Sequence, residues 1–257
     1  MVQNHSEQNV KLIISYDGAD YSGWQIQPGV RTVQGELESA LQKIHRKPII
    51  LYGAGRTDAG VHAVAQCANF FSTIQTMPPR NFVPALNALL PRDIRVTAAA
   101  AVPPQFHARF SATARAYQYR IACGRPLLPH ETRYAMSIPF APSLPLLNSY
   151  ARLLLGETDC TLFASPSDAI FTRGSGSRFR RIGHAHFFIE NGLLVFEIAA
   201  NAFFRKMVRS IVGTFLHYAQ RELPTSAFER ILREGKREKA GPTAPPHGLF
   251  LWNVFYD

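Results

Sequence analysis

The chain has 257 residues, 46% of them hydrophobic, which is enough for one large core or two ordinary ones. Lysine and arginine total 28 against 18 aspartates and glutamates, and a formal net charge of +10 favours nucleic acid as a partner, with plain solubility as the alternative. No apolar run is long enough to span a membrane and residues 1–7 lack the features of a signal peptide, so we expect a soluble, cytoplasmic protein.

Cysteine and histidine give no sign of a disulfide framework or a metal centre. Cys67, Cys123 and Cys160 are far apart and include no C-x-x-C pair. The nine histidines include no H-E-x-x-H motif. We therefore expect no metal, and we expect the cysteines to be small buried hydrophobic residues.

The first part of the chain has the β-α-β-β-α-β order of a ferredoxin-like unit. Its apolar residues change from alternating to helical spacing and back again. The expected elements are a strand at 10–16, a helix at 33–44, strands at 49–54 and 65–72, a helix at 81–90 and a strand at 94–102.

The segment 102–105, with Pro103 and Pro104, breaks regular structure and predicts a domain boundary between residues 104 and 105. The order β-α-β-β-α-β then repeats, with a two-residue hairpin turn at Asn191 and Gly192. The fold is thus predicted as α+β, with two related ferredoxin-like halves, 1–104 and 105–257. Their antiparallel sheets could join and leave a basic cleft. The expected elements are strands at 117–122, 180–189, 193–199 and 249–256, and helices at 144–155, 203–219 and near 227–234.

A glycine-dense loop at 53–63, with the letters GAGRTDAGVHA, lies between the two strands expected at 49–54 and 65–72. It carries one carboxylate, Asp58, with Arg56 two residues before it and His62 four residues after it. Loops of this kind on rigid strands are common functional sites. An ordinary turn capped by the Asp58 side chain is the simpler interpretation, and His62 then packs in that turn. A phosphate-binding loop is disfavoured because no Lys-Ser or Lys-Thr pair follows.

The helix expected at 203–219 has an apolar stripe and a polar face. In projection, Lys206, Ser210, Gly213, Thr214 and His217 form the polar face. Arg205 and Arg209 instead lean toward the interior. A partly buried guanidinium requires an anion nearby, unless its stem alone is buried.

Other segments combine aromatic, amide and basic side chains suited to RNA. The turn after the first strand includes Trp24 and Gln25, and the segment 106–110 precedes Arg115. We predict that Tyr119 packs in the core and that Tyr117 points to the opposite face of its strand. The arginines at 173, 178, 180 and 181 surround a Gly-Ser loop that could close on phosphates.

The letters GRTDAGVHA at 55–63 resemble the signature of the TruA family, the tRNA pseudouridine synthases. Further blocks are similar to that family, in its order, along nearly the whole chain. They are YDGADYSGWQIQ from residue 16, TVQGELE from 32, LNALLPRDI from 86, FHARFSATARAYQY from 106, NAFFRKMVRSIVGT from 201 and GPTAPPHGLFLWNVFY from 241. Two departures are Cys160, where the family usually has phenylalanine after Asp159, and the loop 165–178.

The resemblance implies isomerisation of uridine at positions 38, 39 and 40 in the anticodon stem-loop of tRNA, by cofactor-free homodimers. It implies that Asp58 is the catalytic nucleophile or base and that Arg209 pairs with it. Tyr117 would stack on the flipped uracil, and Leu249 would line its pocket. The residues expected to contact tRNA are Trp24, Gln25, Arg56, Phe106, His107, Ala108, Arg109, Phe110, Arg115, Arg125, Arg178 and Arg205.

Two other functions compete with this expectation. A non-catalytic tRNA-binding module would keep the basic surface without needing Asp58 or its arginine partner. A nucleotide hydrolase would need a pair of metal-binding carboxylates or a phosphate-binding lysine, and the sequence presents neither.

Overall fold

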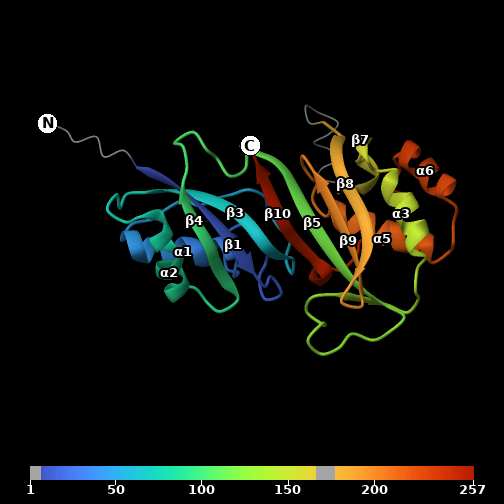
Figure 1. The fold of residues 1–257 in the computed structure, drawn as a ribbon, viewed down its shortest axis with the longest axis horizontal. Helices are drawn as coiled ribbons and strands as arrows, with labels where there is room; N and C mark the ends of the chain where they lie inside the picture. Colours follow the sequence, from blue (N-terminus) through green and yellow to red (C-terminus); the bar gives the residue numbers. More distant parts are fainter. Residues whose placement is uncertain (1–6, 166–176) are drawn as a thin grey trace. The chain divides into compact units, whose positions relative to one another are not determined.

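A computed structural model describes residues 7–165 and 177–257 (Figure 1). The chain forms two compact units. Unit 1 comprises Met1–Thr113 and Leu251–Asp257, and unit 2 comprises Ala114–Phe250. The described helices include none that is both long and apolar enough to cross a membrane.

Unit 1 has the predicted β-α-β-β-α-β order. Its strands are arranged β4-β1-β3, with β2 beside β3, and the β1–β3 and β1–β4 pairs are antiparallel. This is the strand order of a ferredoxin-like sheet, and β10 also pairs with β3. The elements are β1 (Gln8–Tyr16), α1 (Val33–His45), β2 (Tyr52–Gly53), β3 (His62–Ser72), α2 (Phe82–Leu89) and β4 (Ile94–Ala101).

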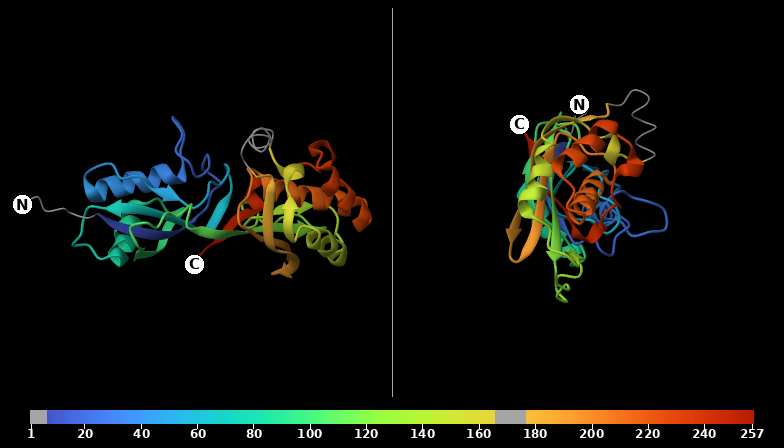
Figure 2. Two further views of the ribbon diagram at one scale, coloured as in Figure 1. Left: turned by 90° about the horizontal axis from the view of Figure 1, so that it is seen from above. Right: turned by 90° about the vertical axis from the view of Figure 1, so that its right-hand side faces the viewer.

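The core of unit 1 follows from the alternation of its first strand. Val10, Leu12 and Ile14 are fully buried on one face of β1. The connection from β1 to α1 leaves the body of the unit as an extended loop, drawn in blue in Figure 2, and residues 26–31 on it are exposed. Thr32 ends this loop, and its side chain caps α1 by accepting a hydrogen bond from Gly35 N.

Unit 2 repeats the same order with additions. Its strands run β5-β9-β8-β7, all antiparallel, and β6 pairs with β5 in parallel. The elements are β5 (Ala112–Cys123), β6 (Met136–Ile138), α3 (Leu144–Arg152), β7 (Gly156–Asp159), β8 (Phe179–Glu190), β9 (Leu193–Ala200), α5 (Met207–Ala219) and α6 (Thr225–Glu234). The last strand, β10 (Leu249–Tyr256), begins in unit 2, and its residues from Leu251 onward belong to unit 1. The α+β class is therefore confirmed, and β6 and β7 are strands that periodicity did not predict.

The hairpin between β8 and β9 is confirmed by its backbone. Asn191 and Gly192 both have positive φ, 50° and 75°, and Glu190 pairs with Leu193. Positive φ at both central residues is what a two-residue turn of this hand requires.

The two predicted elements that are shortened most are β2 and α5. β2 contains Tyr52 and Gly53 alone, because the backbone of Leu51 bonds to side chains of α1 instead of a strand: its N–H donates to Glu38 and its carbonyl accepts from Gln34. The helix expected from residue 203 begins at Met207, because Lys206 has a left-handed backbone, φ 60°, which a right-handed helix cannot continue through.

The boundary between the units lies at 113/114 in the structure, nine residues beyond the predicted one, and 251–257 belong to unit 1. The reason is a set of polar contacts that fastens the segment after Pro103 to unit 1. The Asn9 amide donates to Pro103 O and Phe106 O at 3.0 and 2.8 Å. The Ala108 carbonyl accepts from Tyr256 Oη at 2.8 Å.

Candidate active site

The Asp58 loop connects β2 to β3 in unit 1. Asp58 is half-buried, Thr57 before it is buried and Arg56 is exposed. Val61 N donates to Asp58 O at 3.2 Å and Gly60 has φ 76°, so residues 58–61 form a β-turn with glycine at its third position. The turn is closed by the main-chain oxygen of Asp58, so a turn and a reactive carboxylate are compatible at this residue.

The segment from Tyr16 to Trp24 holds this loop on both sides of Asp58. Before Asp58, the Tyr16 hydroxyl lies 2.7 Å from Thr57 Oγ1, and Trp24 N donates to Thr57 O at 3.1 Å. After Asp58, Gly60 N donates to Tyr21 O at 3.3 Å. We call this set of contacts the brace; it fixes the backbone that carries the carboxylate.

Gly23 shows how closely the brace approaches the loop. Its φ is +95°, and a Cβ built at this residue would lie 2.7 Å from Thr57 O. Both the backbone angle and the space therefore require glycine. The buried His62 adds a further contact, because its Nδ1 accepts from Gly18 N at 3.0 Å, and the predicted packing of His62 in the turn is confirmed.

Tyr16→Phe tests the brace by removing one hydroxyl. We expect the free energy of unfolding to fall by about 1 kcal/mol, since Thr57 loses a buried hydrogen bond. On the tRNA substrate that the resemblance implies, we also expect kcat to fall by roughly tenfold with KM unchanged, because the loop that holds Asp58 is less well fixed. Steady-state kinetics and thermal unfolding measure the two effects.

Tyr150→Phe is the matched control for that variant. The Tyr150 hydroxyl is also part of a buried tyrosine, and it donates to Leu223 O in unit 2. It should lose stability and retain kcat. An equal loss of kcat in both variants would show that the brace has no specific role.

The predicted tRNA contacts near the loop divide by exposure. Arg56 is exposed, and its Nε donates to Gln25 Oε1 at 3.0 Å, so these two side chains are held together on the surface. Trp24 is only 2% exposed, and its ring fills the space where Gly53 has no side chain. The Trp24 side chain, predicted to contact tRNA, is part of the core under the loop.

The segment 106–110 also differs in part from its prediction. Ala108, predicted to contact tRNA, is fully buried; its N–H donates to Asn69 Oδ1 at 2.8 Å and its carbonyl accepts from Tyr256 Oη, so it has a structural role. Arg109 and Phe110 are exposed, while Phe106 and His107 are half-buried. These four side chains remain at the surface as candidates for RNA contact.

In unit 2, Tyr117 and Tyr119 lie on β5. They are two residues apart in a regular ladder, opposite Ile198 and Phe196, so they point to the same face and the predicted opposite orientation is wrong. Tyr119 is in the core, as predicted, at 0% exposed. The Tyr117 ring is 9% exposed and contacts Phe203 edge-on, with centroids 5.0 Å apart.

Arg209 lies in the first turn of α5 and is half-buried. Its Nε donates to Ala244 O at 2.7 Å, and Ala244 N donates to Arg209 O at 3.0 Å. This reciprocal pair of hydrogen bonds fixes the guanidinium. Arg205, predicted to lean inward as well, is exposed because it precedes the start of the helix.

The segment 241–245 covers the side of α5 that was predicted to be polar. Ser210, Gly213 and Thr214, three members of the predicted polar face, are buried there. Gly241 N donates to Thr214 Oγ1 at 3.1 Å, and Tyr119 Oη donates to Pro245 O at 2.8 Å. These contacts explain why small and hydroxyl side chains occur on that face of α5.

Leu249 follows this segment at the start of β10 and is 5% exposed. Between them lies His247, whose pKa is lowered by burial and by the charge of Arg209. Unit 2 thus places Arg209 beside the segment 244–249.

The remaining predicted arginines already have partners in their own surroundings. Arg125 makes two 2.7 Å hydrogen bonds to the Glu131 carboxylate, which hold the pKa of Glu131 near 2. Arg178 pairs with Asp159 at 3.1 Å, and Arg115 donates to Asn201 O at 3.0 Å. Arg173 lies outside the described residues.

Periodicity and motifs missed several residues that support these groups. Arg237 donates to Gly241 O and Thr243 Oγ1, and so holds the segment that holds Arg209. No feature of the sequence pointed to it. The sequence patterns also did not identify the hydroxyls of Tyr16 and Thr57. The position of Tyr16, at the end of a predicted strand and before a segment that contains glycine, was the one available signal.

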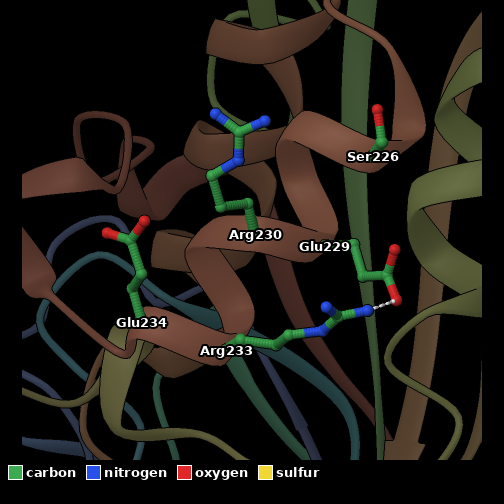
Figure 3. Close-up of a pocket in the computed structure, with 5 residues that line it drawn as sticks. All are labelled: Ser226, Glu229, Arg230, Arg233 and Glu234. Atoms are coloured by element: carbon green, nitrogen blue, oxygen red, sulfur yellow. Dashed lines mark hydrogen bonds and ion pairs between the residues drawn. The ribbon is translucent and has the colours of Figure 1, made fainter.

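A hollow of about 350 Å³ lies on the surface of α6, and its lining includes none of the residues predicted for the site (Figure 3). It is lined by one helix alone, and an ion pair joins Glu229 and Arg233 across it. In residues 7–165 and 177–257 no group of three or more His, Cys, Asp or Glu side chains could hold a metal ion.

Comparison with known proteins decides the family. The family model described as tRNA pseudouridine synthase matches residues 12–111 and 150–257. The chain belongs to the tRNA pseudouridine synthase family. This family consists of isomerases that convert uridine to pseudouridine, so the chain is an isomerase of tRNA. The Asp58 loop in unit 1 and the Arg209 position in unit 2 fall within the matched residues, and Tyr117 lies between the two matched ranges.

Individual relatives agree with the family model. The tRNA pseudouridine synthase A of Treponema denticola is 51% identical over 98% of this chain and 94% of its own length. That of Brachyspira hyodysenteriae is 41% identical over 96% of this chain and 98% of its own. A putative M16-like peptidase from Alicyclobacillus acidocaldarius has a TM-score of 0.19 at 9% identity, which is too low to support an inference.

Proposed function

We propose that this tRNA pseudouridine synthase isomerises uridines 38, 39 and 40 in the anticodon stem-loop. The observation that carries the proposal is the brace: a single half-buried carboxylate, Asp58, is held on a loop fixed by Tyr16, Tyr21 and Trp24. Family membership supplies the reaction, and similarity of the sequence blocks to the TruA group supplies the tRNA positions.

The reaction requires one carboxylate and a site that holds the uracil base while it turns. The bond from uracil N1 to ribose C1′ breaks, the uracil turns, C5 bonds to C1′ and loses its proton, and N1 gains a proton. Asp58 acts as nucleophile at C1′ or as base at C2′. No electron acceptor is needed at any step, and we propose that neither metal nor organic cofactor takes part.

Arg209, Tyr117 and Leu249 complete the proposed catalytic site. The guanidinium of Arg209, already oriented by Ala244, would pair with the Asp58 carboxylate and keep it ionised. Tyr117 would stack on the flipped uracil and Leu249 would line its pocket, so that burial of the base offsets the cost of unstacking it.

Binding of the tRNA is proposed to use exposed cations of both units. Arg56 and Arg109 in unit 1 and Arg178 and Arg205 in unit 2 are exposed and could contact phosphates. A cytoplasmic homodimer that binds one tRNA across both copies is part of the same proposal.

The test is release of tritium from tRNA labelled at uracil C5, with the anticodon-arm uridines replaced one at a time. We expect release that falls when uridine 38, 39 or 40 is replaced and is unaffected by replacement of uridines elsewhere. If replacement of uridine 38, 39 or 40 left the amount of tritium released unchanged, the proposed specificity would be overturned. No release from any uridine, with tRNA still bound, would favour a binding module.

A further inference from the structure

Three rings lie in series at the surface of unit 1. The His107 ring is 5.0 Å from Tyr52 and 4.5 Å from Phe110, and the Arg109 guanidinium lies 5.5 Å from the Phe110 ring. We call Tyr52, His107 and Phe110 the aromatic platform. Its last ring, Phe110, is 77% exposed, more than any other large hydrophobic side chain in the described residues.

The platform stands on a fixed backbone. His107 N donates to Ser111 Oγ, Ser111 N donates back to His107 O, and Arg109 N donates to His107 Nδ1, all between 2.9 and 3.1 Å. Below it, the buried Ala108 is held by Asn69 and Tyr256. A phenyl ring is thus held in water by a rigid turn, although burial would be more favourable.

The chemistry around Phe110 indicates its occupant. Arg109 is adjacent, the chain carries a formal charge of +10, and Tyr52 belongs to the strand that leads directly into the Asp58 loop. A protein partner would need an apolar patch, whereas Phe110 is a single ring beside a cation. A base of single-stranded RNA needs a flat face and a positive charge for its phosphate, and both are present here.

We propose that the aromatic platform stacks one unpaired base of the bound tRNA on Phe110, and that Arg109 contacts the phosphate next to that base. The proposal rests on the proposed function, because it takes tRNA as the substrate. It assigns two different roles to neighbouring residues, one apolar and one electrostatic.

Phe110→Leu and Arg109→Gln separate these roles through their salt dependence. Phe110→Leu should weaken binding of the tRNA by roughly tenfold, the size of one lost base stack, with the same slope of affinity against salt as the wild type. Arg109→Gln should weaken binding and reduce that slope by about one, since one phosphate contact is lost. Phe110→Trp keeps a flat ring, so it should retain affinity, and its added fluorescence should be quenched when tRNA binds.

Phe255→Leu is the matched control, because Phe255 is an exposed phenylalanine of the same unit on β10. It should bind tRNA as the wild type does. If Phe110→Leu bound tRNA with wild-type affinity and still isomerised it, the proposed stacking on the aromatic platform would be overturned, and the proposed function would stand. A change in self-association of Phe110→Leu with tRNA affinity unchanged would assign the ring to a protein contact instead. Failure of the wild type to bind tRNA would overturn the proposed function.

Discussion

Replacement of Asp58 by asparagine is expected to abolish isomerisation while leaving affinity for tRNA within roughly tenfold of the wild type. The amide keeps the size of the side chain, so the turn at 58–61 and the brace remain, but it supplies neither a nucleophile nor a base. The loss should reach about four orders of magnitude or more in kcat. Tritium release and filter binding measure turnover and affinity on the same preparation.

Asp20→Asn is the control, because Asp20 is an exposed carboxylate in the connection between β1 and α1. It should retain turnover. If Asp58→Asn turned over tRNA at a rate near that of Asp20→Asn, Asp58 would not be the reacting carboxylate.

Replacement of Gly213 by alanine is expected to have the second largest effect, on stability and activity together. A Cβ at this position would lie 1.7 Å from Pro242 O, so the segment 241–245 must move away from α5. Alanine favours a helix over glycine by about 1 kcal/mol, but an overlap of this size outweighs that gain. We expect a net loss of about 2 kcal/mol in the free energy of unfolding, measured by urea denaturation.

The same variant should lower kcat at temperatures where it is still folded. Movement of the segment withdraws Ala244 O from Arg209 Nε and leaves the guanidinium less well oriented. Gly183→Ala, in β8, is the control: apart from the residue itself and its two chain neighbours, no atom lies within 4 Å of its added Cβ, so stability should stay within about 0.5 kcal/mol. Wild-type stability and turnover in Gly213→Ala would contradict the role given to the segment.

The fold could be predicted from sequence where local signals were strong. Alternation in β1, helical spacing in α1 and the Asn191-Gly192 turn each identified an element that the structure confirms. The start of α5 could not be predicted, because apolar residues at helical spacing continue through Phe203 and Phe204. The left-handed backbone of Lys206, which prevents α5 from starting earlier, is not marked by the amino-acid composition of this segment.

The candidate site was predictable in part. The letters around Asp58 marked the loop, but its brace depends on contacts between Tyr16 and Thr57, 41 residues apart in the chain. Trp24 shows that burial also depends on residues distant in the sequence. An aromatic residue among polar neighbours looks like an RNA contact in sequence, yet the absence of a side chain at Gly53 makes room for its burial.

The helical projection of α5 did not identify the burial of its polar face, for a related reason. Projection of one helix assumes that its polar side faces water, whereas the segment 241–245 returns from farther along the chain and covers Ser210 and Thr214. The hydroxyl of Thr214 then serves as an acceptor for Gly241. Tertiary contacts of this kind decide burial, and periodicity within one helix cannot report them.

Position-resolved mapping of pseudouridine in an unmodified tRNA transcript tests the central claim most directly. The transcript is incubated with the wild type or with Asp58→Asn, in buffer that contains a metal chelator and no added cofactor. The wild type should introduce pseudouridine in the anticodon arm at positions 38 to 40, and Asp58→Asn should introduce none. Pseudouridine formed by Asp58→Asn, or formed by the wild type only outside the anticodon arm, would contradict it.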